Sequence, residues 1–188
     1  YYSYFLSKYA GKEGFVHAVE PIPMFGRIWE KNVKKNRLNN LKLHQFALGA
    51  EEKTVRMGIP EVDGVLHHGM TKIVSTRKEK YLQYYDVEMK IPDKLFQDIS
   101  KIDFIKCDVE GYENFVFSNM LNLIKKHRPL IQSELTGTEN RMNVIGLFKD
   151  LNYSVKILKD NKLISVNEDK ISSYNCDFYF TPEFNSEK

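Results

Sequence analysis

Carboxylate side chains follow two apolar runs in the middle of the chain, where strands of an α/β sheet are expected to end. Asp108 and Glu110 come after the run over residues 102–107, and Glu134 closes the run over residues 130–134. Open α/β sheets bind their ligands beyond the carboxyl ends of their strands. A carboxylate there can remove the proton of a hydroxyl group, and three together could instead hold a divalent cation, which we favour less. For Glu134, a structural role such as capping a helix is an equal alternative.

Another carboxylate, Glu20, follows the short apolar run over residues 15–19 and comes just before a helix start marked by Pro23. In nucleoside sites an acid at this place binds the ribose, because a carboxylate accepts both protons of a vicinal diol. A solvent-exposed acid at the end of a strand explains the same pattern equally well. Glu20 is therefore a candidate for binding a nucleoside-containing cofactor only together with other signals.

Candidates for contact with a substrate lie in a segment rich in turns and tyrosines. His67 and His68 are adjacent, and adjacent side chains of an extended segment point to opposite sides, so a shared metal ion is not expected. An exposed pair in a loop is the favoured interpretation, and a substrate-side base is the alternative. Tyr84, with Tyr81 and Tyr85 beside it, could stack on a sugar, although tyrosines of this kind more often pack within strands.

Helices and strands alternate along most of the chain, which is typical of a doubly wound, mostly parallel α/β sheet. The predicted strands are 15–19, 41–48, 102–107, 130–134, 153–158 and 176–180, and the predicted helices are 1–10, 23 into the polar run 34–40, 92–99, 113–126 and 140–151. We expect the strand over 102–107 to be the central one. The spacing of apolar residues predicts that Phe5, Tyr9, Phe115 and Met142 face inward from their helices.

Residues 54–90 depart from this alternation. Two strand-like runs, 54–57 and 84–89, enclose the turn-rich stretch 58–69. We predict an inserted β-hairpin or lid over 54–90 within a single domain that comprises residues 1–188.

The composition is that of a soluble globular protein, with 188 residues, 42% hydrophobic and 28% charged. The net charge of +3 is too small to argue for nucleic acid or a membrane surface as a partner, and no apolar run is long enough to span a membrane. Cys107 and Cys176 both lie in apolar runs and are predicted to be buried thiols in a reducing, cytoplasmic location. A small-molecule or glycan acceptor is the expected partner, and the sequence leaves a homodimer open.

Three strings carry a resemblance to a known family. Asp108–Glu113 reads Asp-Val-Glu-Gly-Tyr-Glu, Val19–Phe25 reads Val-Glu-Pro-Ile-Pro-Met-Phe, and Phe46–Gly49 reads Phe-Ala-Leu-Gly. In their identity and order they resemble the FkbM family of S-adenosylmethionine-dependent methyltransferases. The resemblance implies a class I, Rossmann-like methyltransferase fold and O-methylation of a hydroxyl group on a sugar, glycolipid or natural product. Members carry a first strand and a glycine-rich loop before a position like Tyr1, so this chain is expected to be a fragment that lacks both.

The resemblance also implies roles for individual residues. It places Asp108 under the methyl-bearing sulfur or the acceptor hydroxyl, and Glu110 and Glu134 on the acceptor side. The expected cofactor contacts are Glu20 and Pro21 at the ribose, Ala47 and Leu48 near the adenine, and Tyr1 and Tyr2 beside the glycine-rich turn. Two alternatives remain open, namely an NAD-binding or nucleotide-sugar enzyme on a similar sheet and a non-catalytic binding module.

Overall fold

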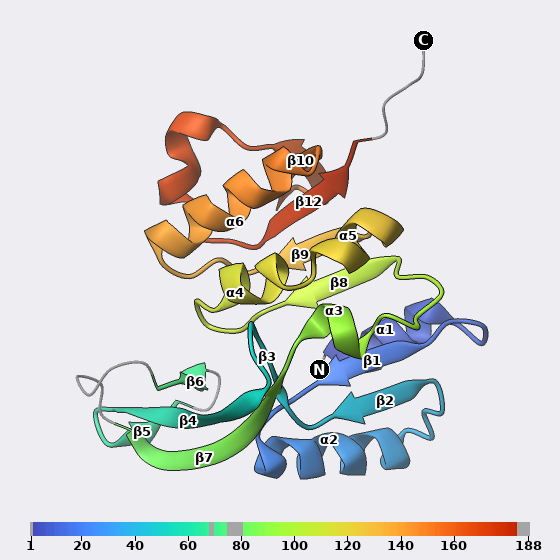
Figure 1. Cartoon of the computed structure of the whole chain (residues 1–188), viewed down its shortest axis with the longest axis vertical. Helices are drawn as coiled ribbons and strands as arrows, with labels where there is room; N and C mark the ends of the chain where they lie inside the picture. Colours follow the sequence, from blue (N-terminus) through green and yellow to red (C-terminus); the bar gives the residue numbers. More distant parts are fainter. Residues whose placement is uncertain (1, 68–69, 75–80, 184–188) are drawn as a thin grey trace. The chain divides into compact units, whose positions relative to one another are not determined.

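The structure is a computed structural model that describes residues 2–67, 70–74 and 81–183. The chain forms two compact units, residues 1–90 and residues 91–188 (Figure 1). Each unit is described by itself. Among the described residues, no helix has both the length and the apolar character needed to cross a membrane.

The first part of the N-terminal unit alternates helix and strand, as predicted. Its elements are α1 (Tyr2–Ala10), β1 (Val16–Val19), α2 (Pro23–Lys35) and β2 (Leu41–His44). β1 and β2 pair in parallel, with Val16 opposite Leu41. α2 approaches the chain around β2 closely at Gly26, where an added Cβ would lie 2.2 Å from Nε2 of Gln45. A larger residue at this position of the helix would require the side chain of Gln45 to move.

The inward face predicted for α1 is wrong. Tyr9 is 85% exposed and Phe5 is 42% exposed, whereas Ser7 is buried. A hydrogen-bonding side chain orients this helix instead, because Nδ2 of Asn40 lies 3.0 Å from the carbonyl oxygen of Ser7 and 2.9 Å from that of Gly11. The helix is therefore held at its polar side and its carboxyl end.

The second part of the N-terminal unit is built on a long antiparallel pair. Its strands are β3 (Ala47–Leu48), β4 (Lys53–Val62), β5 (Val65–Leu66), β6 (Lys72–Ile73) and β7 (Tyr81–Lys90). β4 pairs antiparallel with β7, and β3 pairs in parallel with β7. The strands predicted over 54–57 and 84–89 are confirmed, while the single strand predicted over 41–48 is wrong. That segment divides at Gln45 and Phe46, because β2 pairs with β1 whereas β3 pairs with β7.

The C-terminal unit contains a mixed five-stranded sheet. Its strands are β8 (Phe104–Cys107), β9 (Leu130–Ser133), β10 (Tyr153–Lys159), β11 (Lys162–Ser165) and β12 (Phe178–Pro182), in the order β11-β10-β12-β9-β8. β8 and β9 are parallel, whereas β12 is antiparallel to both β9 and β10. The prediction of a mostly parallel sheet with β8 at its centre is therefore wrong for the described strands. A tight turn at Asp160 and Asn161, both with positive φ, makes β11 antiparallel to β10.

Helices cover one face of this sheet, and they differ from the predicted ones. They are α3 (Pro92–Leu95), α4 (Glu113–Ser118), α5 (Leu121–His127) and α6 (Thr138–Asp150), followed by the short 3-10 helix η2 (Glu168–Ser173). The single helix predicted over 113–126 is wrong, because the chain begins a new helix after Met120. The carboxylate of Asp93 accepts hydrogen bonds from the backbone N–H groups of Asn122 and Leu123, both at 3.0 Å, and so caps α5. Phe115 of α4, predicted to face inward, is 49% exposed.

The core of the C-terminal unit centres on Phe148 of α6. Its ring stacks on Phe180 of β12 at 4.2 Å and meets Phe117 edge-on at 5.0 Å. Figure 1 shows α6 lying along β10 and β12. Met142, predicted to face this core, is 49% exposed, because the buried face of α6 is the one that carries Val144, Ile145 and Phe148.

The two cysteines differ in their surroundings. Cys107 is buried, and burial, reinforced by the nearby carboxylates of Glu113 and Asp108, raises the pKa of its thiol. Cys176 is exposed, so the prediction that it is buried is wrong. It precedes β12 instead of lying within it.

Candidate functional site

The carboxyl ends of β8 and β9 bring several charged and polar side chains to one edge of the sheet. Lys106 of β8 lies opposite Gln132 of β9, and Gln132 lies opposite Tyr179 of β12. Because residues directly opposite each other on paired strands point to the same side, Lys106 and Gln132 lie on the same face of the sheet. Asp108 follows β8 directly, and the exposed Glu134 follows β9. The structure thus brings two of the predicted carboxylates to the same edge.

A buried lysine neutralises part of this edge. Nζ of Lys106 lies 3.5 Å from Oδ2 of Asp108 and 3.5 Å from Oδ2 of Asp177. The side chain of Lys106 is 9% exposed, whereas that of Asp108 is 40% exposed. Gln132 donates a hydrogen bond to Asp177 from its amide group. Lys106 is therefore held from inside the protein, while Asp108 is open to a ligand.

Sequence reasoning missed Lys106 and Asp177 as members of this site. A lysine that interrupts an apolar run was the available signal for Lys106, since such a charge is buried only where it has partners. Asp177 could not be found in this way, because it directly precedes the antiparallel strand β12, 71 positions along the chain from Lys106.

The turn after β8 has an unusual backbone. Glu110 has φ of 52° and Gly111 has φ of 90°. Positive φ is uncommon for a residue with a Cβ, so the turn must be held by its surroundings. Glu110 is half-buried there.

In the N-terminal unit, Glu20 lies at the carboxyl end of β1. Its backbone N–H donates to the carbonyl oxygen of His44 at 3.0 Å, which continues the pairing of β1 with β2. The backbone N–H of Ile22 donates to Oε1 of the Glu20 carboxylate at 2.8 Å. Burial raises the pKa of this carboxyl group, and the bond from Ile22 opposes that change. Glu20 is thus a half-buried acid at a strand end, as expected of a ligand-binding carboxylate.

The other residues predicted to contact a cofactor lie in different elements of the same unit. Ala47 is buried and Leu48 is half-buried in β3, where they lie opposite Met89 and Lys90 of β7. Pro21 is half-buried after β1, and Tyr2 begins α1 with 47% of its surface exposed. Tyr1 lies outside the described residues. Their contact with a cofactor stays a prediction.

The candidates for substrate contact lie around the β4–β7 pair. The backbone N–H of His67 donates to the carbonyl oxygen of Pro60 at 3.0 Å, and His68 lies outside the described residues. Tyr84 is 51% exposed on β7, whereas Tyr81 is buried. An added Cβ at Gly58 would lie 2.4 Å from the Tyr81 ring, so this ring packs directly on the backbone of β4. A packing role is therefore confirmed for Tyr81, and the roles of His67 and Tyr84 stay predictions.

A histidine pair joins the two strands near Glu20, with His17 on β1 and His44 on the paired strand β2. Nδ1 of His17 and Nε2 of His44 are 2.9 Å apart, and the two rings stack at 5.2 Å. Burial is the main cause that lowers the pKa of each imidazole. The charge of Lys42 adds to it for both, and the neighbouring His17 adds to it for His44.

We expect acid to destabilise the protein through this pair. The unfolded chain takes up protons near the ordinary pKa of 6.5, while the folded pair stays neutral to lower pH. The stability that the neutral pair contributes to the folded state is therefore fully present above pH 6.5. It is lost as the pH falls toward the lowered pKa values of the folded state. Thermal unfolding measured between pH 8 and pH 5 should show this loss, and the double variant His17→Gln/His44→Gln should show a smaller one. An equal loss in both proteins would contradict the assignment.

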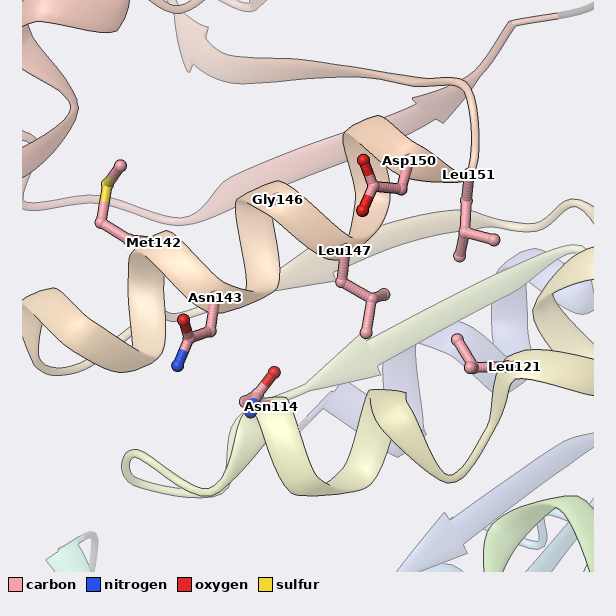
Figure 2. A pocket seen from close by; sticks show the side chains of 8 residues that line it. All are labelled: Asn114, Leu121, Met142, Asn143, Gly146, Leu147, Asp150 and Leu151. Atoms are coloured by element: carbon pink, nitrogen blue, oxygen red, sulfur yellow. The ribbon is translucent and has the colours of Figure 1, made fainter.

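The helical layer of the C-terminal unit carries an open groove of about 570 Å³. Asn143 and Leu147 of α6 point toward Asn114 and Leu121 on the facing helices (Figure 2). The remaining lining residues are Met142, Gly146, Asp150 and Leu151. Residues of the strand ends do not line it, so this groove is separate from the carboxylates of the candidate site. Within the described ranges, no three His, Cys, Asp or Glu side chains gather as a metal site.

Comparison with known proteins identifies similar sequences and folds. The family model of the methyltransferase FkbM domain matches residues 1–159, while a comparison with curated protein sequences finds no match. Among solved structures, the chain is similar to the crystal structure of methyltransferase FkbM from Methylobacillus flagellatus KT, with a TM-score of 0.52 and 15% identity. The alignment covers 88% of this chain and 36% of that protein, so this chain spans about a third of its length. At this identity the likeness shows an α/β fold.

Proposed function

Because this chain belongs to the FkbM methyltransferase family, we propose that it transfers a methyl group from S-adenosylmethionine to a hydroxyl group of a sugar, glycolipid or natural product. The observation that carries the proposal is the extent of the family match. It covers residues 1–159 and thereby includes every residue that the sequence marks as a candidate for chemistry.

The surroundings of Glu20 support a nucleoside-containing cofactor. S-Adenosylmethionine supplies a methyl group on a positively charged sulfur and carries a ribose with a vicinal diol. The half-buried carboxylate of Glu20 suits such a diol, because it accepts both hydroxyl protons. Ile22 orients this carboxylate through Oε1, and among the described residues no donor to Oε2 is recorded. We propose that Pro21, Ala47, Leu48, Tyr1 and Tyr2 complete this cofactor site.

The acids beyond β8 and β9 support a hydroxyl-bearing acceptor. Asp108 is proposed to accept the proton of the reacting hydroxyl, and Glu110 and Glu134 to bind the rest of the acceptor. A hydroxyl group is a poor nucleophile until a base removes its proton. This edge carries several carboxylates together with the lysine Lys106. The carboxylates would repel a phosphorylated or carboxylated acceptor, so a neutral polyol is favoured. A divalent cation stays the less favoured alternative.

The experiment that tests the cofactor assignment is calorimetry with S-adenosylmethionine. We expect Glu20→Ala to weaken binding by about 1–3 kcal/mol, the cost of losing a hydrogen bond to a charged group. The variant Glu30→Ala removes an exposed acid of α2 and serves as the matched control. It should bind the cofactor with unchanged affinity.

Other outcomes distinguish the alternatives. Unchanged affinity in Glu20→Ala would remove Glu20 from the site. Binding of NAD in place of S-adenosylmethionine would support the dinucleotide-binding alternative. A protein that binds neither cofactor would support a non-catalytic binding module.

A further inference from the structure

The last acid of the Asp-Val-Glu-Gly-Tyr-Glu string differs from the other two, because it is completely buried. Glu113 begins α4 with 0% of its surface exposed. Its Oε1 accepts hydrogen bonds from the backbone N–H of Val109 at 3.0 Å and from that of Gly111 at 3.2 Å. Its Oε2 accepts a hydrogen bond from Nδ2 of Asn140 at 2.6 Å. All three partners, two backbone N–H groups and one side-chain amide, donate hydrogen bonds to this carboxyl group.

Glu113 binds the same turn that carries the proposed acceptor-side acid. The two backbone N–H groups that it holds flank Glu110, the residue with φ of 52°. The carboxylate thereby stabilises the left-handed conformation of Glu110 and Gly111 from the inner side of the turn. Asp108 directly precedes the first of these N–H groups, so its position depends on the same contact.

Asn140 extends this contact to the turn after β9. Its Oδ1 accepts a hydrogen bond from the backbone N–H of Asn114 at 3.1 Å. Its Nδ2 also donates to the carbonyl oxygen of Thr136 at 3.2 Å, two residues beyond Glu134. One side chain from α6 therefore contacts the start of α4, the buried carboxylate and the turn that follows β9.

We propose that Glu113 and Asn140 are positioning residues that hold the turns after β8 and β9 as one hydrogen-bonded unit. This unit sets the places of Asp108 and Glu110 relative to Glu134. The positioning role rests on the proposed methyl transfer, whereas the hydrogen-bonded unit itself can be tested without it.

Substitution can exchange the donor and the acceptor of the hydrogen bond between Asn140 and Glu113. Glu113→Gln turns an amide NH2 toward the NH2 of Asn140, so two donors face each other. Asn140→Asp places a second carboxylate against Glu113. In Glu113→Gln/Asn140→Asp the new amide donates to the new carboxylate, which can still accept from the N–H of Asn114. The double variant keeps the net charge and loses only the bond to Thr136.

We expect each single variant to speed amide hydrogen exchange at Val109, Gly111 and Asn114 by at least about tenfold, since each loses a charged hydrogen bond. In the double variant, exchange at these three amides should slow again to nearly the rate of the unsubstituted protein. Exchange in β10 should be the same in all of these proteins. The rate of methyl transfer should fall in the single variants and recover in the double one, because Asp108 is proposed to accept the proton of the reacting hydroxyl.

Glu139→Gln changes the exposed acid next to Asn140 and is the matched control, with no expected change in exchange. Additive losses in the double variant would overturn the proposal, because a general packing role predicts no rescue. Rescue of exchange without rescue of the rate of methyl transfer would overturn the positioning role alone. Absence of cofactor binding in the unsubstituted protein would contradict the proposed function, and the exchange pattern would still test the hydrogen-bonded unit.

Discussion

The substitution Asp108→Asn is expected to lower the rate of methyl transfer by about 10²- to 10⁴-fold, the usual contribution of a general base. Asparagine has nearly the same shape, and its amide oxygen can still accept a hydrogen bond from Lys106. It cannot take up the proton of the acceptor hydroxyl. The loss should therefore appear in turnover far more than in cofactor affinity.

The measurement is the release of S-adenosylhomocysteine from S-adenosylmethionine in the presence of neutral glycosides, together with calorimetry of the cofactor. Asp103→Asn is the matched control, because Asp103 precedes the same strand β8 at its other end. The side chain of Asp103 is 72% exposed and pairs with Lys101, so its removal should leave the rate unchanged.

Two outcomes would contradict the proposed role of Asp108. Retained turnover would mean that another group removes the proton. An equal loss in turnover and in cofactor affinity would mean that Asp108 mainly binds the cofactor. Asp177 pairs with the same lysine as Asp108 and offers a second comparison. Asp177→Asn should preserve turnover better than Asp108→Asn, because Asp177 is proposed only to hold Lys106.

The substitution Phe148→Ala is expected to destabilise the C-terminal unit by about 3–5 kcal/mol, as is typical when a buried phenylalanine is truncated. Phe148 has 0% of its surface exposed and contacts the rings of Phe180, Phe117 and Tyr153. These rings come from β12, α4 and β10. The cavity would therefore weaken the packing of α6 against both the sheet and the helix that Glu113 begins.

Urea unfolding, monitored by far-UV circular dichroism, should show this effect as a lower urea concentration at the midpoint of unfolding. Met142→Ala on the exposed side of the same helix is the matched control, and its effect should stay within about 0.5 kcal/mol. An equal shift of the midpoint in the two variants would contradict the assignment of Phe148 to the core. A small shift in Phe148→Ala would mean that α6 does not unfold together with the sheet.

Local patterns in the sequence determined where many elements lie and which acids follow them. Strand-like runs over 54–57 and 84–89 predicted the strands that became β4 and β7, and short apolar runs predicted β1, β8 and β9. Glu20, Asp108 and Glu134 each come directly after one of these strands, as predicted. Such features are readable because a strand and the residue that ends it are set by neighbours only a few positions away.

Tertiary structure alone decided how these elements combine. Asp93 caps a helix that begins 28 positions later and thereby divides the helix predicted over 113–126. Asp177, just before the antiparallel strand β12, reaches Lys106, and Asn140 reaches Glu113 from α6. A pattern of residue types does not specify such partners, because each depends on which distant segments pack together. The acids that follow the strands were therefore visible in the sequence, whereas the buried lysine and the buried glutamate that hold them were recognised only in the folded chain.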